Sequence, residues 1–165
     1  NGFGRIGRLV FRHLFENFSS EVEIVALNDL TDTKTLAHLL KHDSNYGLYP
    51  RKIDFDSEHL IIDGRKFRVF SDRDPEKLPW RDLEVDLVLE CTGVFRHFEG
   101  ASKHLKAGAK RVIISAPAKS KNIPSFVLGV NANQLDPQKD LIVDMGSCTT
   151  NCLAPICKVL HENFG

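Results

Sequence analysis

The residues best suited to do chemistry lie at positions 145–155, Met-Gly-Ser-Cys-Thr-Thr-Asn-Cys-Leu-Ala-Pro. This stretch follows an apolar run at residues 141–143 and precedes apolar residues at helical spacing, so we expect Cys148 where a strand gives way to a helix. Unpaired backbone N–H groups and the helix dipole favour an anion at that point, and a thiol there is expected to lose its proton more readily than a free one. The sequence therefore predicts a nucleophilic cysteine. Hydroxyl groups that could hold a charged oxygen beside the sulfur flank it at Ser147, Thr149 and Thr150.

Packing is the alternative role for the cysteines, because cysteine is among the most buried residue types. Cys152 and Cys157 fit this alternative, since both fall on or near the expected inward side of the helix. That side also carries Leu153, Ile156, Val159 and Leu160. The four cysteines lack the paired spacing of a zinc site and are too sparse for a disulfide scaffold. We expect free thiols in a reducing compartment and no metal site.

A glycine-rich turn opens the sequence. Gly2, Gly4 and Gly7 fit the G-x-G-x-x-G pattern, in which the glycines allow a tight turn, the approach of a pyrophosphate and close packing of helix on strand. Residues 22–27 are predicted to form a buried strand that leads to Asp29, 22 residues after Gly7. A carboxylate about 20 residues after the turn binds the adenosine ribose and would repel a 2′-phosphate, so NAD is expected rather than NADP. The alternative for Asp29 is an ordinary turn residue.

Length and composition limit the possible functions. The 165 residues suffice for one sizeable core, and 22 basic residues balance 22 acidic ones, so no overall charge recruits nucleic acid or a membrane. The apolar runs are too short to span a bilayer, and no signal-peptide pattern opens the chain. We therefore expect a soluble, cytoplasmic protein.

The remaining segments alternate between strands and helices, which is typical of a parallel sheet. Helices are predicted around Leu9, Val10, Leu14 and Phe18, around Leu36, Leu39 and Leu40 after a cap at 31–33, and at 101–107 before Gly108. Strands are predicted at 85–90, 111–115, 126–131 and 141–143, with an antiparallel hairpin at 53–70 that turns at Asp63-Gly64. We predict an α/β, Rossmann-type doubly wound and mostly parallel sheet with a small hairpin insertion. The first strand, expected before Gly2, is missing.

Two further residues follow a predicted strand directly. Thr92 and Gly93 come after the strand at 85–90, and ligands of such sheets bind outside the carboxyl ends of the strands. Both are therefore predicted to contact the cofactor. Cys91, beside them, is assigned to packing.

The sequence resembles the glyceraldehyde-3-phosphate dehydrogenase family. Ser-Cys-Thr-Thr-Asn-Cys-Leu-Ala-Pro is similar to the active-site signature of that family, and the resemblance runs from Asn-Gly-Phe-Gly-Arg-Ile-Gly-Arg through Ile-Ile-Ser-Ala-Pro to the cysteine motif. It implies an NAD-binding domain at residues 1–147 and a catalytic-cysteine helix at 148–165 that leads into a further catalytic domain, in a homotetrameric glycolytic enzyme. Matching positions imply that Cys148 is the nucleophile and that Ser147 and Thr149 contact substrate or phosphate. They imply NAD contacts at Arg5, Ile6, Asp29, Arg73 and Ser115.

The nucleotide turn and the cysteine together predict one reaction. The thiolate attacks an aldehyde, the adduct passes hydride to nicotinamide, a thioester remains, and phosphate releases an acyl phosphate. The resemblance implies that the general-base histidine and most phosphate-binding groups lie beyond Gly165, so these residues alone are expected to bind NAD at most. Two alternatives stay open: an erythrose-4-phosphate dehydrogenase, and a non-catalytic NAD-binding or thiol-redox domain that uses Cys148 and Cys152.

Overall fold

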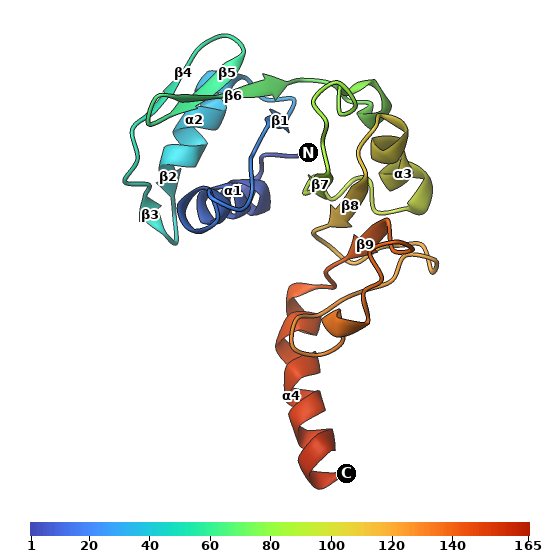
Figure 1. Cartoon of the computed structure of the whole chain (residues 1–165). Helices are drawn as coiled ribbons and strands as arrows, with labels where there is room; N and C mark the ends of the chain where they lie inside the picture. Colours follow the sequence, from blue (N-terminus) through green and yellow to red (C-terminus); the bar gives the residue numbers. More distant parts are fainter. The chain divides into compact units, whose positions relative to one another are not determined.

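The computed structural model describes all 165 residues. The chain divides into two compact units, Asn1–Leu78 and Pro79–Gly165, and each unit has its own strands and hydrophobic core (Figure 1). No helix in either unit combines the length and the apolar character that crossing a membrane would require.

The first unit contains a four-stranded sheet of order β1-β6-β5-β4 and a two-stranded ribbon, β2-β3. Its elements are α1 (Arg5–Asn17), β1 (Ala26–Asn28), α2 (Thr33–Lys41), β2 (His42–Asp43), β3 (Gly47–Leu48), β4 (Ile53–Phe55), β5 (His59–Ile62), β6 (Arg65–Phe70) and a 3-10 turn, η1 (Pro75–Lys77). Strands β1 and β6 are parallel, whereas β4, β5 and β6 are antiparallel. The predicted hairpin is confirmed, and its last strand also extends the parallel part of the sheet.

The turn of this hairpin lies at Asp63 and Gly64, as predicted. Both residues have positive φ angles, 49° and 85°, which is the conformation of the two central residues in a type I′ turn. This turn matches the twist of the strands and places Ile62 opposite Arg65. Local turn chemistry therefore fixes the register of β5 on β6.

The helix predicted around Leu9, Val10, Leu14 and Phe18 is present as α1, but its buried apolar residue is not one of these four. Phe11 is the buried apolar residue of the helix, and Phe18 lies exposed at its end. The ring of Phe11 meets those of Phe3 and Phe67 edge-on, at centroid distances of 5.6 and 5.1 Å. An aromatic cluster that joins the glycine turn, α1 and β6 therefore decides which face of the helix is buried.

The predicted strand at 22–27 is also shorter than expected. Only Ala26–Asn28 form β1, because only these residues lie alongside Arg68–Phe70 of β6. Val22 and Val25 are exposed. The prediction correctly located the end of the strand, which is the part that positions Asp29.

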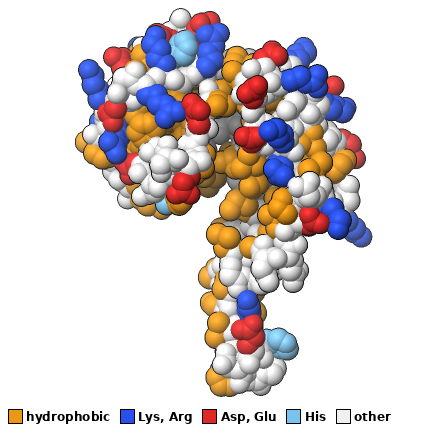
Figure 2. All heavy atoms as spheres, viewed as in Figure 1, with side chains coloured by type: hydrophobic (Ala, Val, Ile, Leu, Met, Phe, Trp, Pro, Cys, Tyr) orange, Lys and Arg blue, Asp and Glu red, His pale blue; other side chains and the backbone are white.

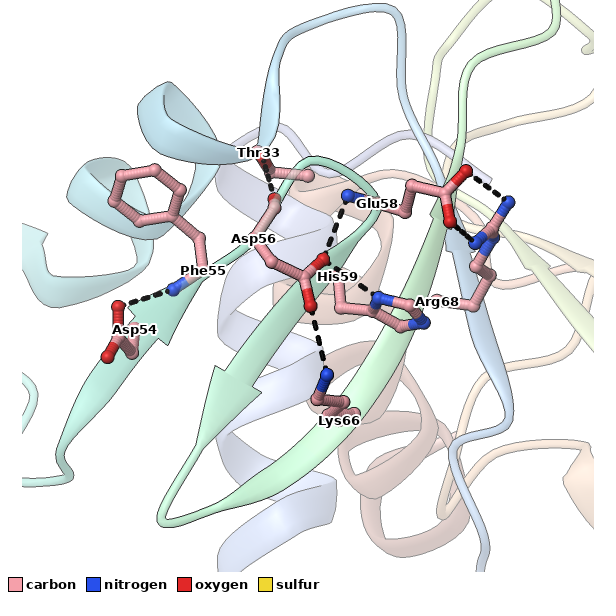
Figure 3. Close-up of polar contacts among 8 residues, drawn as sticks. All are labelled: Thr33, Asp54, Phe55, Asp56, Glu58, His59, Lys66 and Arg68. Atoms are coloured by element: carbon pink, nitrogen blue, oxygen red, sulfur yellow. Dashed lines mark hydrogen bonds and ion pairs between the residues drawn. The ribbon is translucent and has the colours of Figure 1, made fainter.

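Asp56, at the tight connection between β4 and β5, collects several hydrogen bonds (Figure 3). Its Oδ1 accepts the N–H of Glu58 at 2.9 Å and lies 2.8 Å from His59 Nδ1, and its Oδ2 lies 3.1 Å from Lys66 Nζ. The backbone hydrogen bond from Glu58, followed by those from His59 and Lys66, holds the pKa of Asp56 well below its usual range. The folded unit therefore favours the ionised carboxylate.

This lowered pKa predicts acid sensitivity. The stabilisation is complete above the unfolded-state pKa of about 3.9 and is lost as the pH falls towards the folded-state value. We expect Asp56→Asn to lower the free energy of unfolding more at pH 6 than at pH 3, as measured by urea unfolding. Asp54→Asn is the matched control, because Asp54 only accepts the N–H of its neighbour Phe55 in Figure 3. An equal loss at both pH values would contradict this assignment.

The second unit contains a parallel sheet of order β7-β8-β9. Its elements are β7 (Leu87–Glu90), α3 (Phe98–Lys106), β8 (Arg111–Ile114), a 3-10 turn, η2 (Ala132–Gln134), β9 (Ile142–Asp144) and α4 (Cys148–Phe164). Helix α3 covers this sheet, and the core contains Ala101, Val112, Ile114, Ile123 and Ile142. The predicted α/β class with parallel strands is confirmed, with its parallel strands divided between the two units.

The end of α3 follows the prediction. Gly108 has a φ of 113°, and a Cβ at this position would lie 2.4 Å from Cβ of Arg81, so only glycine fits here. The predicted strand at 126–131 is wrong. The one β-bridge nearby joins Ser125, just before this segment, to Asp144. Residues 128–131 form a turn in which the N–H of Asn131 donates to the carbonyl of Val127.

The apolar face of α4 is exposed rather than packed, which contradicts the expected inward side. Figure 2 shows hydrophobic atoms along this helix. Its exposed apolar residues are Leu153, Ile156, Val159, Leu160 and Phe164. Cys152 and Cys157 are exposed too, so the packing role predicted for them is wrong within this chain. The helix continues without interruption through Pro155.

Candidate active site

Cys148 lies where the sequence predicts it, between a strand and a helix. Strand β9 ends at Asp144, Gly146 turns the chain with a φ of 68°, and Cys148 is the first residue of α4. Its side chain is an exposed free thiol. The sulfur therefore stands at the positive end of the helix dipole and is accessible to a substrate.

The flanking hydroxyls organise the start of this helix. Ser147 is the N-cap: its Oγ accepts the N–H of Thr150 at 2.9 Å and lies 2.8 Å from Thr149 Oγ1 and 2.7 Å from Thr150 Oγ1. A cap of this kind satisfies one of the free N–H groups of the first turn. Ser147 therefore holds the turn at the start of α4, where Cys148, Thr149 and Thr150 are all exposed.

Two residues that the sequence analysis missed fix the same turn. The carboxylate of Asp144 is 2% exposed; it accepts the N–H of Gly146 at 2.6 Å, the N–H of Ala118 at 3.0 Å and the hydroxyl of Ser125 at 2.8 Å. The amide of Asn151 donates to the carbonyls of Met145 and Ser147 at 2.7 and 2.9 Å. Asp144 is the last residue of an apolar strand, and a polar residue at that position could have indicated its supporting role.

The predicted cofactor residues of this unit lie at the same edge of its sheet. Thr92 and Gly93 follow β7, Ser115 follows β8, and the turn to Cys148 follows β9. Backbone bonds tie these ends together: Ser115 N–H donates to the Glu90 carbonyl at 3.0 Å, and Met145 N–H donates to the Ile114 carbonyl at 3.1 Å. The carboxyl ends of three adjacent parallel strands are the usual place for a ligand in such folds.

The local contacts refine two of these predictions. The hydroxyl of Thr92 donates to Glu90 and accepts the N–H of Val94 at 3.0 Å, so it is engaged within the protein. Gly93 has a φ of 74°, and a Cβ there would meet nothing within 4 Å. Burial raises the pKa of the Cys91 thiol, which suits the packing role assigned to it and separates it from the exposed Cys148.

The glycine turn lies in the first unit and has the features that a pyrophosphate needs. Gly4 is the N-cap of α1 without any side-chain hydrogen bond, and a Cβ at Gly4 would meet nothing within 4 Å. No side chain therefore caps the first N–H groups of α1, at Arg5, Ile6 and Gly7, and the space next to Gly4 is open. An anion site at a helix N-terminus requires both features. The Arg5 guanidinium pairs with Asp43 at 3.1 Å instead.

Asp29 connects this turn to the end of β1. Its Oδ2 accepts the N–H of Phe3 at 2.7 Å and its Oδ1 accepts the N–H of Thr31 at 2.9 Å. A carboxylate oxygen has two acceptor positions, so each keeps one for a ribose hydroxyl. The residues of this turn fit a dinucleotide.

Asn28 is a buried residue that the sequence analysis did not select. Its Nδ2 donates to Asn1 Oδ1 at 2.6 Å and to the Asp72 carbonyl at 3.0 Å, and its Oδ1 accepts the N–H of Asp72 at 2.9 Å. These bonds join the glycine turn to the segment after β6. They therefore position the exposed Arg73, which was predicted to contact NAD.

Comparison with known proteins identifies the family. A family model described as "Glyceraldehyde 3-phosphate dehydrogenase, NAD binding domain" matches residues 1–98. The chain belongs to the glyceraldehyde-3-phosphate dehydrogenase family. The NAD-binding domain of this family is of the Rossmann type, in agreement with the predicted fold and the predicted cofactor.

Relatives in this family match the chain over its whole length. Glyceraldehyde-3-phosphate dehydrogenase of Thermotoga maritima is 57% identical over 165 residues, and that of Geobacillus stearothermophilus is 52% identical. The chloroplastic A form of Scenedesmus vacuolatus is 51% identical over 166 residues. These alignments cover 49%, 48% and 52% of the respective relatives. The chain thus spans about half the length of the curated relatives it matches.

Proposed function

We propose that this chain is the nucleotide-binding half of an NAD-dependent, phosphorylating glyceraldehyde-3-phosphate dehydrogenase. The observation that carries the proposal is the exposed Cys148 thiol at the start of α4, on the same sheet edge as Gly93 and Ser115. The residues after Gly165 would belong to a catalytic domain. In this proposal residues 1–147 bind NAD, and residues 148–165 carry the nucleophile into that domain.

The residues of the chain have distinct tasks in this reaction. Gly2, Gly4 and the N–H groups of Arg5, Ile6 and Gly7 hold the pyrophosphate, and Asp29 holds the adenosine ribose. Arg73 lies at the adenine end, and Thr92, Gly93 and Ser115 border the nicotinamide. NAD, when bound, supplies the acceptor for a hydride.

Cys148 carries the covalent chemistry. Its thiolate adds to the aldehyde carbon of glyceraldehyde 3-phosphate, and the carbon then becomes a thioester by loss of hydride. Free N–H groups at the start of α4 stabilise negative charge beside the sulfur, and Ser147 and Thr149 provide hydroxyls for substrate or phosphate. Inorganic phosphate cleaves the thioester, which yields 1,3-bisphosphoglycerate and restores the thiolate.

The proposal extends to assembly and location. We include a homotetramer in the proposal because the resemblance to this family implies that assembly, in which identical chains share a repeated interface. Most of the relatives compared are bacterial and one is chloroplastic, and we assign this protein to the cytoplasm. The partners of the reaction are the aldehyde phosphate, inorganic phosphate and NAD.

Trapping the acyl-enzyme tests the proposal. The full-length protein is mixed with NAD and glyceraldehyde 3-phosphate without inorganic phosphate, and its peptides are analysed by mass spectrometry. The expected result is a phosphoglyceroyl group on Cys148. A Cys148–Cys152 disulfide after mild oxidation, without any acyl adduct, would overturn the enzyme in favour of a thiol-redox domain. Faster turnover of erythrose 4-phosphate than of glyceraldehyde 3-phosphate would instead identify an erythrose-4-phosphate dehydrogenase.

The role of Asp29 predicts a change in cofactor affinity. Asp29→Asn keeps one oxygen acceptor but loses the charge, so a charge-assisted hydrogen bond to the ribose is weakened and the repulsion of a 2′-phosphate disappears. We expect NAD binding to weaken about tenfold, equivalent to about 1.4 kcal/mol, and the preference for NAD over NADP to narrow. Calorimetric titration with both nucleotides measures this, with Asp54→Asn as the control. An unchanged ratio of the two affinities would rule out the ribose role.

A further inference from the structure

A chain of buried hydrogen bonds lies behind the cofactor edge of the second unit. The indole Nε1–H of Trp80 donates to His104 Nδ1 at 3.0 Å, and His104 Nε2 lies 3.0 Å from Glu90 Oε2. The other carboxylate oxygen, Oε1, accepts the backbone N–H of Thr92 at 2.8 Å and also the Thr92 hydroxyl. This series of hydrogen bonds thus runs from the interior to the loop that carries Thr92 and Gly93.

These three side chains are almost completely excluded from solvent. His104 on α3 is 0% exposed, Glu90 at the end of β7 is 1% exposed and Trp80 is 3% exposed. The imidazole also packs against rings, with its centroid 6.4 Å from Trp80 and 6.3 Å from Phe95. An apolar set of the same volume would fill this space at lower cost, because buried polar groups lose their hydration.

The hydrogen bonds define where the protons lie. An indole nitrogen can only donate, so Nδ1 of His104 must accept and therefore carries no proton. The neutral ring then carries its proton on Nε2, which donates to Glu90 Oε2. Both carboxylate oxygens of Glu90 thus act as acceptors, Oε2 from His104 and Oε1 twice from Thr92. Trp80 thus selects the tautomer of His104 that the carboxylate needs.

Glu90 is also the point at which two predicted cofactor segments meet. Its side chain holds Thr92, and its backbone carbonyl accepts the N–H of Ser115 at 3.0 Å. Because the Thr92 hydroxyl accepts the N–H of Val94, the same network reaches across Gly93, whose φ is 74°. The left-handed loop therefore takes its shape from Glu90, a side chain that is only 1% exposed.

We propose that Trp80, His104 and Glu90 are positioning residues for the nicotinamide nucleotide: they hold the Thr92–Gly93 loop in the conformation that receives it. This inference rests on the proposed NAD-binding function. Glu90 fixes the loop, His104 orients Glu90, and Trp80 fixes the proton of His104. None of the three takes part in the transfer of hydride or phosphate.

Glu90→Gln tests the network with little change in volume. The amide oxygen must face the two donors of Thr92, so its NH₂ group faces the Nε2–H of His104, and two donors oppose each other. If His104 changes tautomer, its Nδ1–H opposes the indole N–H of Trp80 instead. The conflict cannot be relieved within the network, so the loop is expected to shift.

The readout is steady-state kinetics of the full-length protein with NAD and glyceraldehyde 3-phosphate. We expect Glu90→Gln to raise the KM for NAD about tenfold, equivalent to about 1.4 kcal/mol, with kcat at saturating NAD and the KM for the aldehyde within about twofold of the parent. Asp86→Asn is the matched control, because Asp86 is an exposed carboxylate directly before the same strand and pairs with Lys110 at 2.6 Å. It is expected to leave all three constants unchanged.

A second variant tests the assignment of the protons. Trp80→Phe removes the indole donor, so in the Trp80→Phe/Glu90→Gln double variant His104 can carry its proton on Nδ1 and accept from the Gln amide. The double variant is expected to have a lower KM for NAD than Glu90→Gln alone. If Glu90→Gln fails to fold, Trp80→Phe alone is expected to raise the KM for NAD about twofold to threefold, because His104 loses its fixed tautomer.

The outcomes separate this inference from the proposed function. A parent protein that does not bind NAD overturns the proposed function itself. A parent that binds NAD normally, with a Glu90→Gln variant that lowers only kcat and thermal stability, overturns the positioning role, since a smaller folded fraction leaves KM unchanged. A double variant with a KM for NAD at or above that of Glu90→Gln overturns the tautomer assignment.

Discussion

Replacing Cys148 by serine is expected to lower kcat for glyceraldehyde 3-phosphate oxidation in the full-length protein by on the order of 10⁴-fold or more. A serine hydroxyl at this place has the same position at the start of α4, but it is a far weaker nucleophile than a thiolate and forms no thioester. The KM for NAD is expected to stay within about twofold, because the glycine turn and Asp29 are unaffected. Stopped-flow absorbance of NADH measures both the first turnover and the steady state.

The control for this prediction comes from the same helix. Cys157 is exposed on α4 as well, nine positions further along the chain, and nothing assigns it to the chemistry. Cys157→Ser is therefore expected to keep kcat. Residual activity within tenfold of the parent in Cys148→Ser would remove Cys148 as the nucleophile, whereas loss of activity in Cys157→Ser would show that the effect is not specific to Cys148.

Features that depend on a few adjacent residues were predictable from the sequence. The Asp63-Gly64 turn, the glycine that ends α3 and the change from strand to helix before Cys148 all follow from local backbone preferences. The same holds for the glycine turn and the cap of α2 by Asp32, whose carboxylate accepts the N–H of Thr35 at 2.9 Å. The predicted site residues fall at strand ends and helix starts for this reason.

The side chains that support the site could not be found in this way. Asn28 reaches Asp72, which is 44 residues away, and Asp144 reaches Ala118, which is 26 residues away. Such pairs depend on how distant segments meet, and spacing along one segment carries no information about them. The feature they share is a buried polar residue at the last position of a strand, where Glu90 also lies.

Helical periodicity likewise shows that a face is apolar but not what covers it. The pattern in α4 correctly predicts a helix with Leu153, Ile156 and Leu160 on one side, yet that side is exposed in this chain. In α1 the apolar spacing pointed to Leu9, Val10, Leu14 and Phe18, whereas the residue buried by ring contacts with Phe67 is Phe11. Whether an apolar helix face is buried therefore depends on which segment packs against it, and only the structure shows that segment.

Removing the Asp144 carboxylate is expected to have the largest effect on stability. Asp144→Ala leaves the N–H groups of Gly146 and Ala118 and the hydroxyl of Ser125 without their acceptor in a buried place. An orphaned buried donor costs about 1–3 kcal/mol, so we expect the free energy of unfolding to fall by about 3–5 kcal/mol. Urea unfolding of the chain at neutral pH measures this change.

The same carboxylate is expected to affect the reactivity of Cys148. Asp144 holds the turn at Gly146, and that turn sets the N-cap Ser147 and the first residue of α4. Asp144→Asn keeps one oxygen and nearly the same volume, so it is expected to fold while the acylation rate of the full-length protein falls about tenfold. Asp86 is an exposed carboxylate in the same unit, so Asp86→Ala is expected to change neither the free energy of unfolding nor the acylation rate. If Asp144→Ala changed the free energy of unfolding by less than about 1 kcal/mol, the donors at Gly146, Ala118 and Ser125 would have other acceptors, and the turn before Cys148 would owe its shape to the backbone alone.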